Sequence, residues 1–144
     1  MIKHYTIVLL TLITGLFINF PVFALPAPPP YTITVTLKND QFAPVVPLSF
    51  DASKSQNCVS KVAGTVVCTI YHIPDPPTAV AELFFTNTKK PNCSIDVTLA
   101  NTGDGFSFSM ITADYDFTFD PTHWNGYSSL NTTMTVSRAT TPGC

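Results

Sequence analysis

The residues best suited to chemistry lie in one short segment near the end of the chain. Residues 120–127, DPTHWNGY, combine the single tryptophan with a histidine, an asparagine and a tyrosine. Exposed aromatic rings beside an amide can stack on a sugar or anchor a protein partner. We therefore predict a binding site for a protein or glycan at His123, Trp124, Asn125 and Tyr127. The alternative is that Trp124 caps the core and Tyr127 packs beneath the loop, because large aromatic side chains are mostly buried.

Catalytic patterns are missing from the sequence. After the apolar start only His72 and His123 remain, and no G-x-S-x-G or HExxH segment is present. His72 precedes Asp75, but Pro74 lies between them and the pair has no special geometry. We expect no catalytic residue, no bound metal and no cofactor. The alternative is a small secreted enzyme or effector that uses the loop with His123 and Trp124.

Three aspartates form an acidic group ahead of this loop. Alternation places Asp114 and Asp116 on the solvent face of one strand, and Asp120 follows at the strand's end. Calcium favours clustered oxygen ligands of this type. No EF-hand or nonapeptide pattern matches, however, and solvent-facing acids also protect strands from edge-to-edge pairing. The sequence leaves calcium binding at this group open.

The four cysteines predict two disulfides. They follow an export signal, and their intervals of 10, 25 and 51 residues fit no zinc-ligand spacing. A hairpin over 58–73 with the loop 62–64 puts Gly64 in the left-handed conformation and sets Lys61 opposite Thr65. The same register sets two cysteines opposite each other at a separation that a disulfide can bridge. The predicted pairs are Cys58 with Cys68 and Cys93 with Cys144.

The chain begins with a targeting segment. Residues 1–24 read as a signal peptide with a short basic start, an apolar run and a cut before Leu25. A retained membrane anchor is the alternative, but the apolar run is short for a span and a proline-rich leader, 25–30, follows it. Residues 31–144 then form one domain. We expect a protein that is secreted or periplasmic, without a stable membrane anchor.

The charge of the mature chain argues against nucleic acid as a partner. Loss of Lys3 with the signal leaves six basic and nine acidic residues, a net charge of −3. A phosphate backbone requires a basic surface, which this composition does not supply. Asn92 and Asn131 begin N-glycosylation sequons, but chance accounts for them better than modification does, because threonine is abundant.

The clearest pair of strands lies at 92–112, where apolar and polar residues alternate on both sides of an Asn-Thr-Gly-Asp turn. A chain reversal at the Thr102–Gly103 bond predicts three pairs of inward-facing residues: Leu99 with Phe106, Val97 with Phe108 and Ile95 with Met110. The same alternation marks strands at 31–37, 114–119 and 131–137. Pro44 and Pro47 make 41–50 an edge strand or a loop. Residues 78–86 are assigned to a strand rather than a helix.

These segments predict about eight short strands and no helix. The expected fold is an all-β, antiparallel two-sheet sandwich, immunoglobulin-like or Greek-key, stabilised by disulfides. We expect a monomer that acts as a non-catalytic binding or adhesion module. A structural surface subunit is a further alternative, although the proline-marked edges would resist strand addition.

Overall fold

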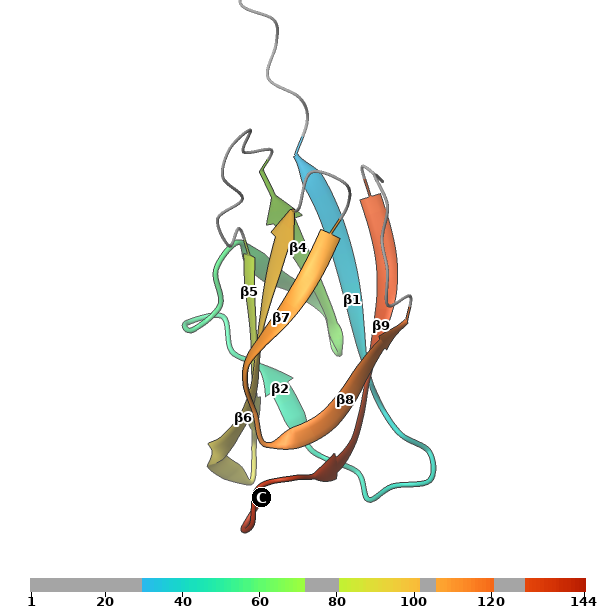
Figure 1. Cartoon of the computed structure of the whole chain (residues 1–144), viewed down its shortest axis with the longest axis vertical. Helices are drawn as coiled ribbons and strands as arrows, with labels where there is room; N and C mark the ends of the chain where they lie inside the picture. The colour runs from blue at the N-terminus through green and yellow to red at the C-terminus, as the bar shows by residue number, and fades with distance from the viewer. Residues whose placement is uncertain (1–29, 72–80, 102–105, 121–128) are drawn as a thin grey trace, which may run out of the picture.

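The computed structural model describes residues 30–71, 81–101, 106–120 and 129–144 (Figure 1). No helix within these ranges is long and apolar enough to cross a membrane. They form nine strands, which are β1 Tyr31–Asn39, β2 Leu48–Phe50, β3 Cys58–Val62, β4 Thr65–Ile70, β5 Ala81–Asn87, β6 Lys90–Asn101, β7 Phe106–Ala113, β8 Tyr115–Asp120 and β9 Ser129–Ala139.

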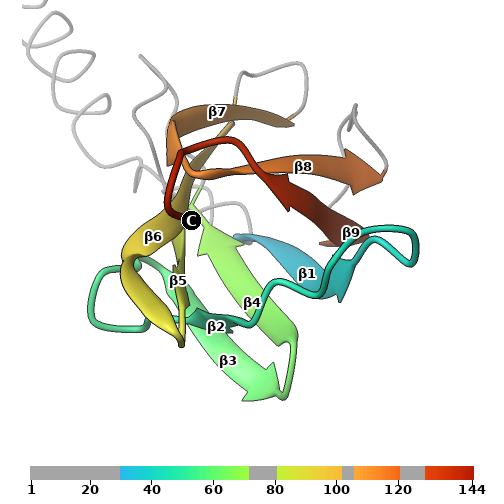
Figure 2. The ribbon, with the colours of Figure 1, turned by 90° about the horizontal axis from the view of Figure 1, so that it is seen from below.

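The strands form two sheets, as expected for a sandwich. One sheet has the order β3-β4-β1-β9-β8 and the other has the order β2-β5-β6-β7 (Figures 1 and 2). The predicted all-β class is confirmed. The strand in addition to the eight predicted ones is β2, an edge strand that begins after Pro44 and Pro47. The pairing is antiparallel, as predicted, except at one place, where β1 and β9 pair in parallel. This pairing gives β1 a neighbour on both sides.

Alternation along β1 produces the core face of its sheet. Ile33 and Val35 are fully buried, and Tyr31 and Leu37 pack against the core at the two ends of the strand. Each such side chain stabilises the fold by about 1.5–3 kcal/mol when it is fully buried. The strands assigned at 78–86, 114–119 and 131–137 are confirmed over their described residues. They bury alternate residues in the same way, among them Leu83, Phe85, Tyr115, Phe119, Met134 and Val136.

The hairpin of β6 and β7 is present, but its register differs from the prediction by two residues. Leu99 pairs with Phe108 and Val97 pairs with Met110, so the connection between the strands is longer than a tight turn at Thr102–Gly103. A shift of two residues leaves the same side chains on the inner face. The alternating pattern therefore could not distinguish the two registers.

Met110 was predicted to face the core, and this prediction is wrong. Its side chain is 61% exposed, and the neighbouring Ile111 is also exposed. The register between β6 and β7 shifts at this point, because Asp96 pairs with Thr112 while Val97 pairs with Met110. Such a bulge bends an edge strand away from its neighbour and from the core.

The hairpin of β3 and β4 contains the first disulfide. Cys58 lies opposite Cys68 and is bonded to it, as predicted. Gly64 has a φ of 75°, which confirms its left-handed turn position. Lys61 does not face Thr65, however. Val62 takes that place, and the irregularity falls between Ser60 and Val62.

Candidate functional site

The predicted binding loop lies outside the described residues. His123, Trp124, Asn125 and Tyr127 all belong to 121–128, so their assignment stays a prediction. The described strand β9 starts after this loop, at Ser129, which pairs with Thr32 near the start of β1.

Asp114 lies where the chain passes from one sheet to the other. It is the single residue between β7 and β8. Its backbone N–H donates to the Ser94 carbonyl at 2.9 Å, and its Oδ2 accepts the Ser94 N–H at 2.7 Å. Its carbonyl accepts the N–H of Thr140 at 2.8 Å. Asp114 therefore has a structural role that explains its acidic side chain without a metal.

The other two aspartates lie on the solvent side of β8. Asp116 Oδ2 accepts from Arg138 Nε at 2.9 Å on an exposed surface, while Asp120 ends the strand. Among the residues that the structure describes, no three carboxylate, histidine or cysteine side chains are placed to hold a metal ion. Asp114 thus stabilises the passage of the chain between the two sheets, and Asp116 forms an ion pair on the surface.

The second predicted disulfide is also present and organises one end of the sandwich. Cys93 of β6 is bonded to Cys144, with a Cα–Cα distance of 5.7 Å (Figure 2). Lys90 adds to this attachment, because its Nζ donates to the carbonyls of Gly143 and Cys144 at 2.8 and 2.7 Å. The segment after β9 is therefore fixed beside the start of β6.

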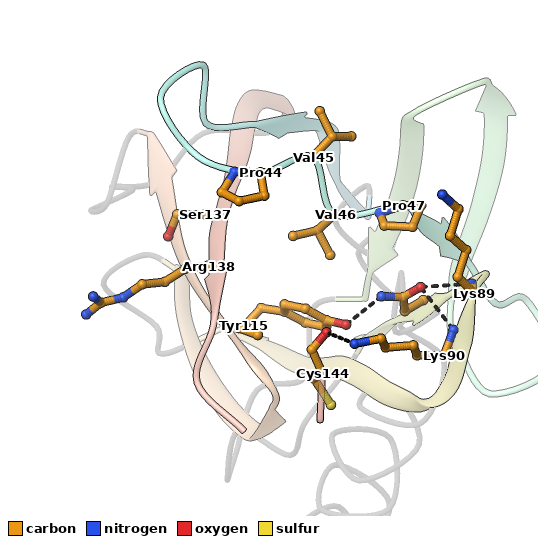
Figure 3. A pocket seen from close by; sticks show the side chains of 12 residues that line it. Pro44, Val45, Val46, Pro47, Lys89, Lys90, Tyr115, Ser137, Arg138 and Cys144 are labelled. Carbon is orange, nitrogen blue, oxygen red and sulfur yellow. Dashed lines mark hydrogen bonds between the residues drawn. The ribbon is translucent and has the colours of Figure 1, made fainter. Parts of the chain in front are cut away.

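A groove of about 350 Å³ opens at this end of the fold (Figure 3). Four segments that are distant in sequence line it: residues 44–47, the β5–β6 turn at 87–90, Tyr115 at the start of β8, and residues 137–139 with Cys144. Its volume lies near the lower limit for small-ligand sites, which corresponds to one or two side chains of a partner.

Residues 44–47, Pro-Val-Val-Pro, form the apolar wall of the groove. A side-chain and a backbone hydrogen bond fix the second half of this segment. The N–H of Val46 donates to Asn39 Oδ1 at 2.8 Å, and the carbonyl of Pro47 accepts the N–H of Thr88 at 2.9 Å. Val46 is buried, whereas Val45 points outward and is exposed (Figure 3). The two prolines restrict the backbone, so the wall is preformed.

Asn87 and Tyr115 form the polar floor. The amide oxygen of Asn87 accepts the backbone N–H groups of Lys89 and Lys90 at 2.8 and 3.1 Å. These two donors determine which end of the amide is the oxygen. Its nitrogen therefore faces Tyr115 and donates to the phenol oxygen at 2.6 Å (Figure 3). Both side chains are almost fully buried, Asn87 at 4% and Tyr115 at 2% exposure.

The orientation of this pair leaves a donor available in the groove. Because the phenol oxygen accepts from Asn87, its own proton is not used in that bond. Tyr115 donates to no acceptor among the described residues. A buried hydroxyl of this kind normally has a partner. The phenol proton of Tyr115 is therefore available to an acceptor on a ligand or on a water molecule.

Basic side chains surround the floor. Lys89 and Lys90 come from the β5–β6 turn, and Arg138 comes from β9. Lys90 binds two carbonyls and Arg138 pairs with Asp116, whereas Lys89 makes no ion pair with any described residue. The described residues that line the groove include no aspartate, glutamate or histidine. The charged side chains among the described groove residues are thus all basic, in a chain whose formal net charge is −2.

Sequence reasoning did not identify this groove. Two local signals were present: the Pro-Val-Val-Pro segment, and an asparagine followed by Thr-Lys-Lys at the end of a strand. An asparagine in such a position often bonds to the backbone of the following turn. Neither signal shows that the two segments meet, because only the disulfide and the sheet order bring them together with Tyr115.

A second hollow, of about 330 Å³, lies between β2 and the β3–β4 hairpin. Its walls are core side chains such as Leu37, Phe50 and Phe85, and its rim has small polar groups such as Ser49 and Thr65. None of the described residues that line it is charged. It has no group that would select one ligand chemistry over another.

The described residues that line the groove offer hydrogen-bond donors, basic side chains and an aliphatic surface. The sulfur of Cys144 is in a disulfide. Comparisons of the chain with protein-family models, with curated proteins and with solved structures gave no match.

Proposed function

We propose that the protein is an exported, non-catalytic binding module that holds a segment of a protein partner in the groove between residues 44–47 and the β5–β6 turn. The observation that supports this proposal is the Asn87–Tyr115 floor. A buried polar pair with a spare donor, beside a preformed apolar wall, has the composition of a recognition site.

Export is part of the same proposal. The two disulfides are typical of extracellular proteins, and they agree with the signal peptide predicted at 1–24. N-terminal sequencing of exported protein should give Leu25 as the first residue. Recovery of the intact apolar start in membrane fractions would contradict it.

A protein ligand fits the groove better than a glycan does. Sugars bind on exposed aromatic faces, whereas the wall of this groove is aliphatic and Tyr115, the one aromatic ring among the described residues that line it, is almost fully buried. A glycan remains the partner expected for the loop with Trp124, which is the second place at which this module could bind.

The test is selection of ligands on the immobilised, oxidised protein from a random peptide display library, with a glycan array in parallel. We expect peptides that bind the wild type and lose binding to Lys89→Gln. Lys61→Gln makes the same charge change outside the groove and should bind normally. Peptides that bind all three proteins equally, or an empty selection, would contradict the proposal.

The second candidate is a surface subunit that adds a strand to a neighbour, and β7 is the observation that favours it. Its sequence, FSFSMITA, has no charge and no proline, it lies at a sheet edge, and Met110 and Ile111 are exposed. The bulge at this point works against continuous pairing. Sedimentation of the purified protein distinguishes the two candidates, since the binding module should remain a monomer.

A further inference from the structure

We infer that the groove selects an acidic ligand: an Asp or Glu carboxylate of an extended peptide, next to a branched aliphatic side chain. This inference rests on the proposed binding function and specifies the chemistry of its ligand. It follows from the donors of the floor, the charges at the rim and the shape of the wall.

The floor requires a hydrogen-bond acceptor. The oxygen of Asn87 is occupied by two backbone N–H groups, and its nitrogen donates to Tyr115. The phenol proton is consequently the unused hydrogen-bonding group of the pair. A ligand donor placed here would leave that proton without a partner, which is unfavourable in a buried site. A ligand carboxylate accepts it.

The rim favours a negative charge on that acceptor. Lys89 has no described ion-pair partner, and Lys90 uses two of its three N–H donors on the carbonyls of Gly143 and Cys144. The carboxylate of Asp116, which follows Tyr115 in the chain, is paired with Arg138. Lys89 is therefore the charged side chain among the described groove residues that has neither an ion pair nor a side-chain hydrogen bond, and hydrogen bonds to charged groups are about twice as strong as neutral ones.

The wall selects what accompanies the carboxylate. Val46 and the two prolines present an aliphatic surface whose backbone is fixed, so a branched aliphatic side chain can be buried at little conformational cost. At about 350 Å³ the groove has room for this side chain and one carboxylate, which lie on the same face of an extended peptide when they are two residues apart. Free phosphate or a sulfated sugar would meet the charge but leave the wall exposed.

The inference can be tested with two capped peptides, Ac-Val-Gly-Glu-Gly-Val-NH2 and the same peptide with Gln in place of Glu. Each is titrated into the ¹⁵N-labelled, oxidised protein, and the shifts of the Asn87 side-chain amide and of the Lys89 and Lys90 backbone amides are followed by NMR. We expect the Glu peptide to bind about tenfold more tightly, which corresponds to about 1.4 kcal/mol. Inorganic phosphate serves as the control for charge alone and should not shift Val46.

Two variants test the site: Asn87→Asp changes both the donor and the local charge, and Lys89→Gln changes the charge alone. Asn87→Asp keeps the acceptor for the turn and offers Tyr115 an acceptor in place of the donor, so the phenol proton turns toward residue 87. We expect this protein to remain folded but to lose its preference for the Glu peptide. Lys89→Gln should weaken binding of the Glu peptide alone, whereas Lys61→Gln should leave both peptides unchanged.

Equal affinity of the Glu and Gln peptides, retained preference in Asn87→Asp, or no shift with either peptide would overturn the inference. The binding-module proposal has a separate outcome. If display selection yields peptides that depend on Lys89 but have no acidic residue, the groove is a binding site and only its acidic specificity is wrong. If selection yields no groove-dependent peptide at all, the proposed function itself fails.

Discussion

Replacement of Tyr115 by phenylalanine tests the polar floor of the groove directly. The change removes one oxygen and keeps the ring, which packs in the core. It leaves the amide nitrogen of Asn87 without its partner at 2.6 Å, at a site where both side chains are at most 4% exposed. We expect Y115F to lower the free energy of unfolding by a measurable amount while the sandwich stays folded.

The size of the loss follows from what is left unsatisfied. A buried donor that loses its acceptor costs about 1–3 kcal/mol. The phenol's own proton, which has no acceptor among the described residues, is removed at the same time, and this gain offsets part of the cost. The net loss should therefore fall in the lower half of that range, about 1–2 kcal/mol.

Urea denaturation of the oxidised protein measures this loss. Tyr71→Phe is the matched control, because Tyr71 is exposed and should tolerate the change within about 0.5 kcal/mol. In an Asn87→Ala background, Y115F should cost almost nothing, since the donor it would strand is absent. An equal loss with and without Asn87, or no loss in the wild-type background, would refute the assigned hydrogen bond.

Three further changes test other parts of the structure. Conversion of Cys93 and Cys144 to alanine opens a 51-residue separation and should lower the free energy of unfolding by about 4 kcal/mol, measured by denaturation without reductant; a loss under about 1 kcal/mol would contradict the loop-closure argument. Burial, with a contribution from the Glu82 carboxylate, raises the pKa of Asp96. The folded state therefore disfavours its ionised form, and the penalty grows as pH rises from the unfolded-state pKa to the higher folded-state pKa. Asp96→Asn should thus raise stability at pH 7 and not at pH 3, and an equal gain at both would contradict the cause. The hydroxyl of Thr86 is buried without a partner among the described residues, so Thr86→Val should stabilise by about 1 kcal/mol in urea, and a loss would show a missed bond.

Local patterns were enough to predict the fold and both disulfides. Alternation identified the strands, and the turn at Gly64 set the register that places Cys58 opposite Cys68. The other pair, Cys93 and Cys144, followed by elimination and is present. These features depend on residues that are neighbours in sequence or across one hairpin, where spacing determines geometry.

Predictions that depended on register or on edge position were less successful. The two-residue shift between Leu99 and Phe108 keeps every side chain on its face, so the hydrophobic pattern contains no information about it. Met110 alternates like a core residue, but it lies on an edge strand at a bulge, where nothing covers it. A sequence pattern shows which face a residue takes and does not show what lies opposite that face.

The groove could not be predicted for a related reason. Its wall, floor and rim come from segments of the chain that are far apart, and only the tertiary fold brings Val46, Asn87 and Tyr115 together. Sequence reasoning favoured the loop with Trp124 because several functional side chain types are adjacent there. The groove residues are individually ordinary, and their arrangement makes them a candidate site.

Hydrogen exchange of the oxidised protein, with and without a display-selected peptide, is the most direct test of where recognition occurs. We predict that bound peptide slows exchange at Val46 and in the β5–β6 turn at Lys89 and Lys90, whose N–H groups lie at the groove. We predict no change in exchange over 121–128. Slower exchange confined to 121–128, with exchange at the groove unchanged, would contradict binding in the groove. It would indicate instead that the partner binds the loop that contains Trp124.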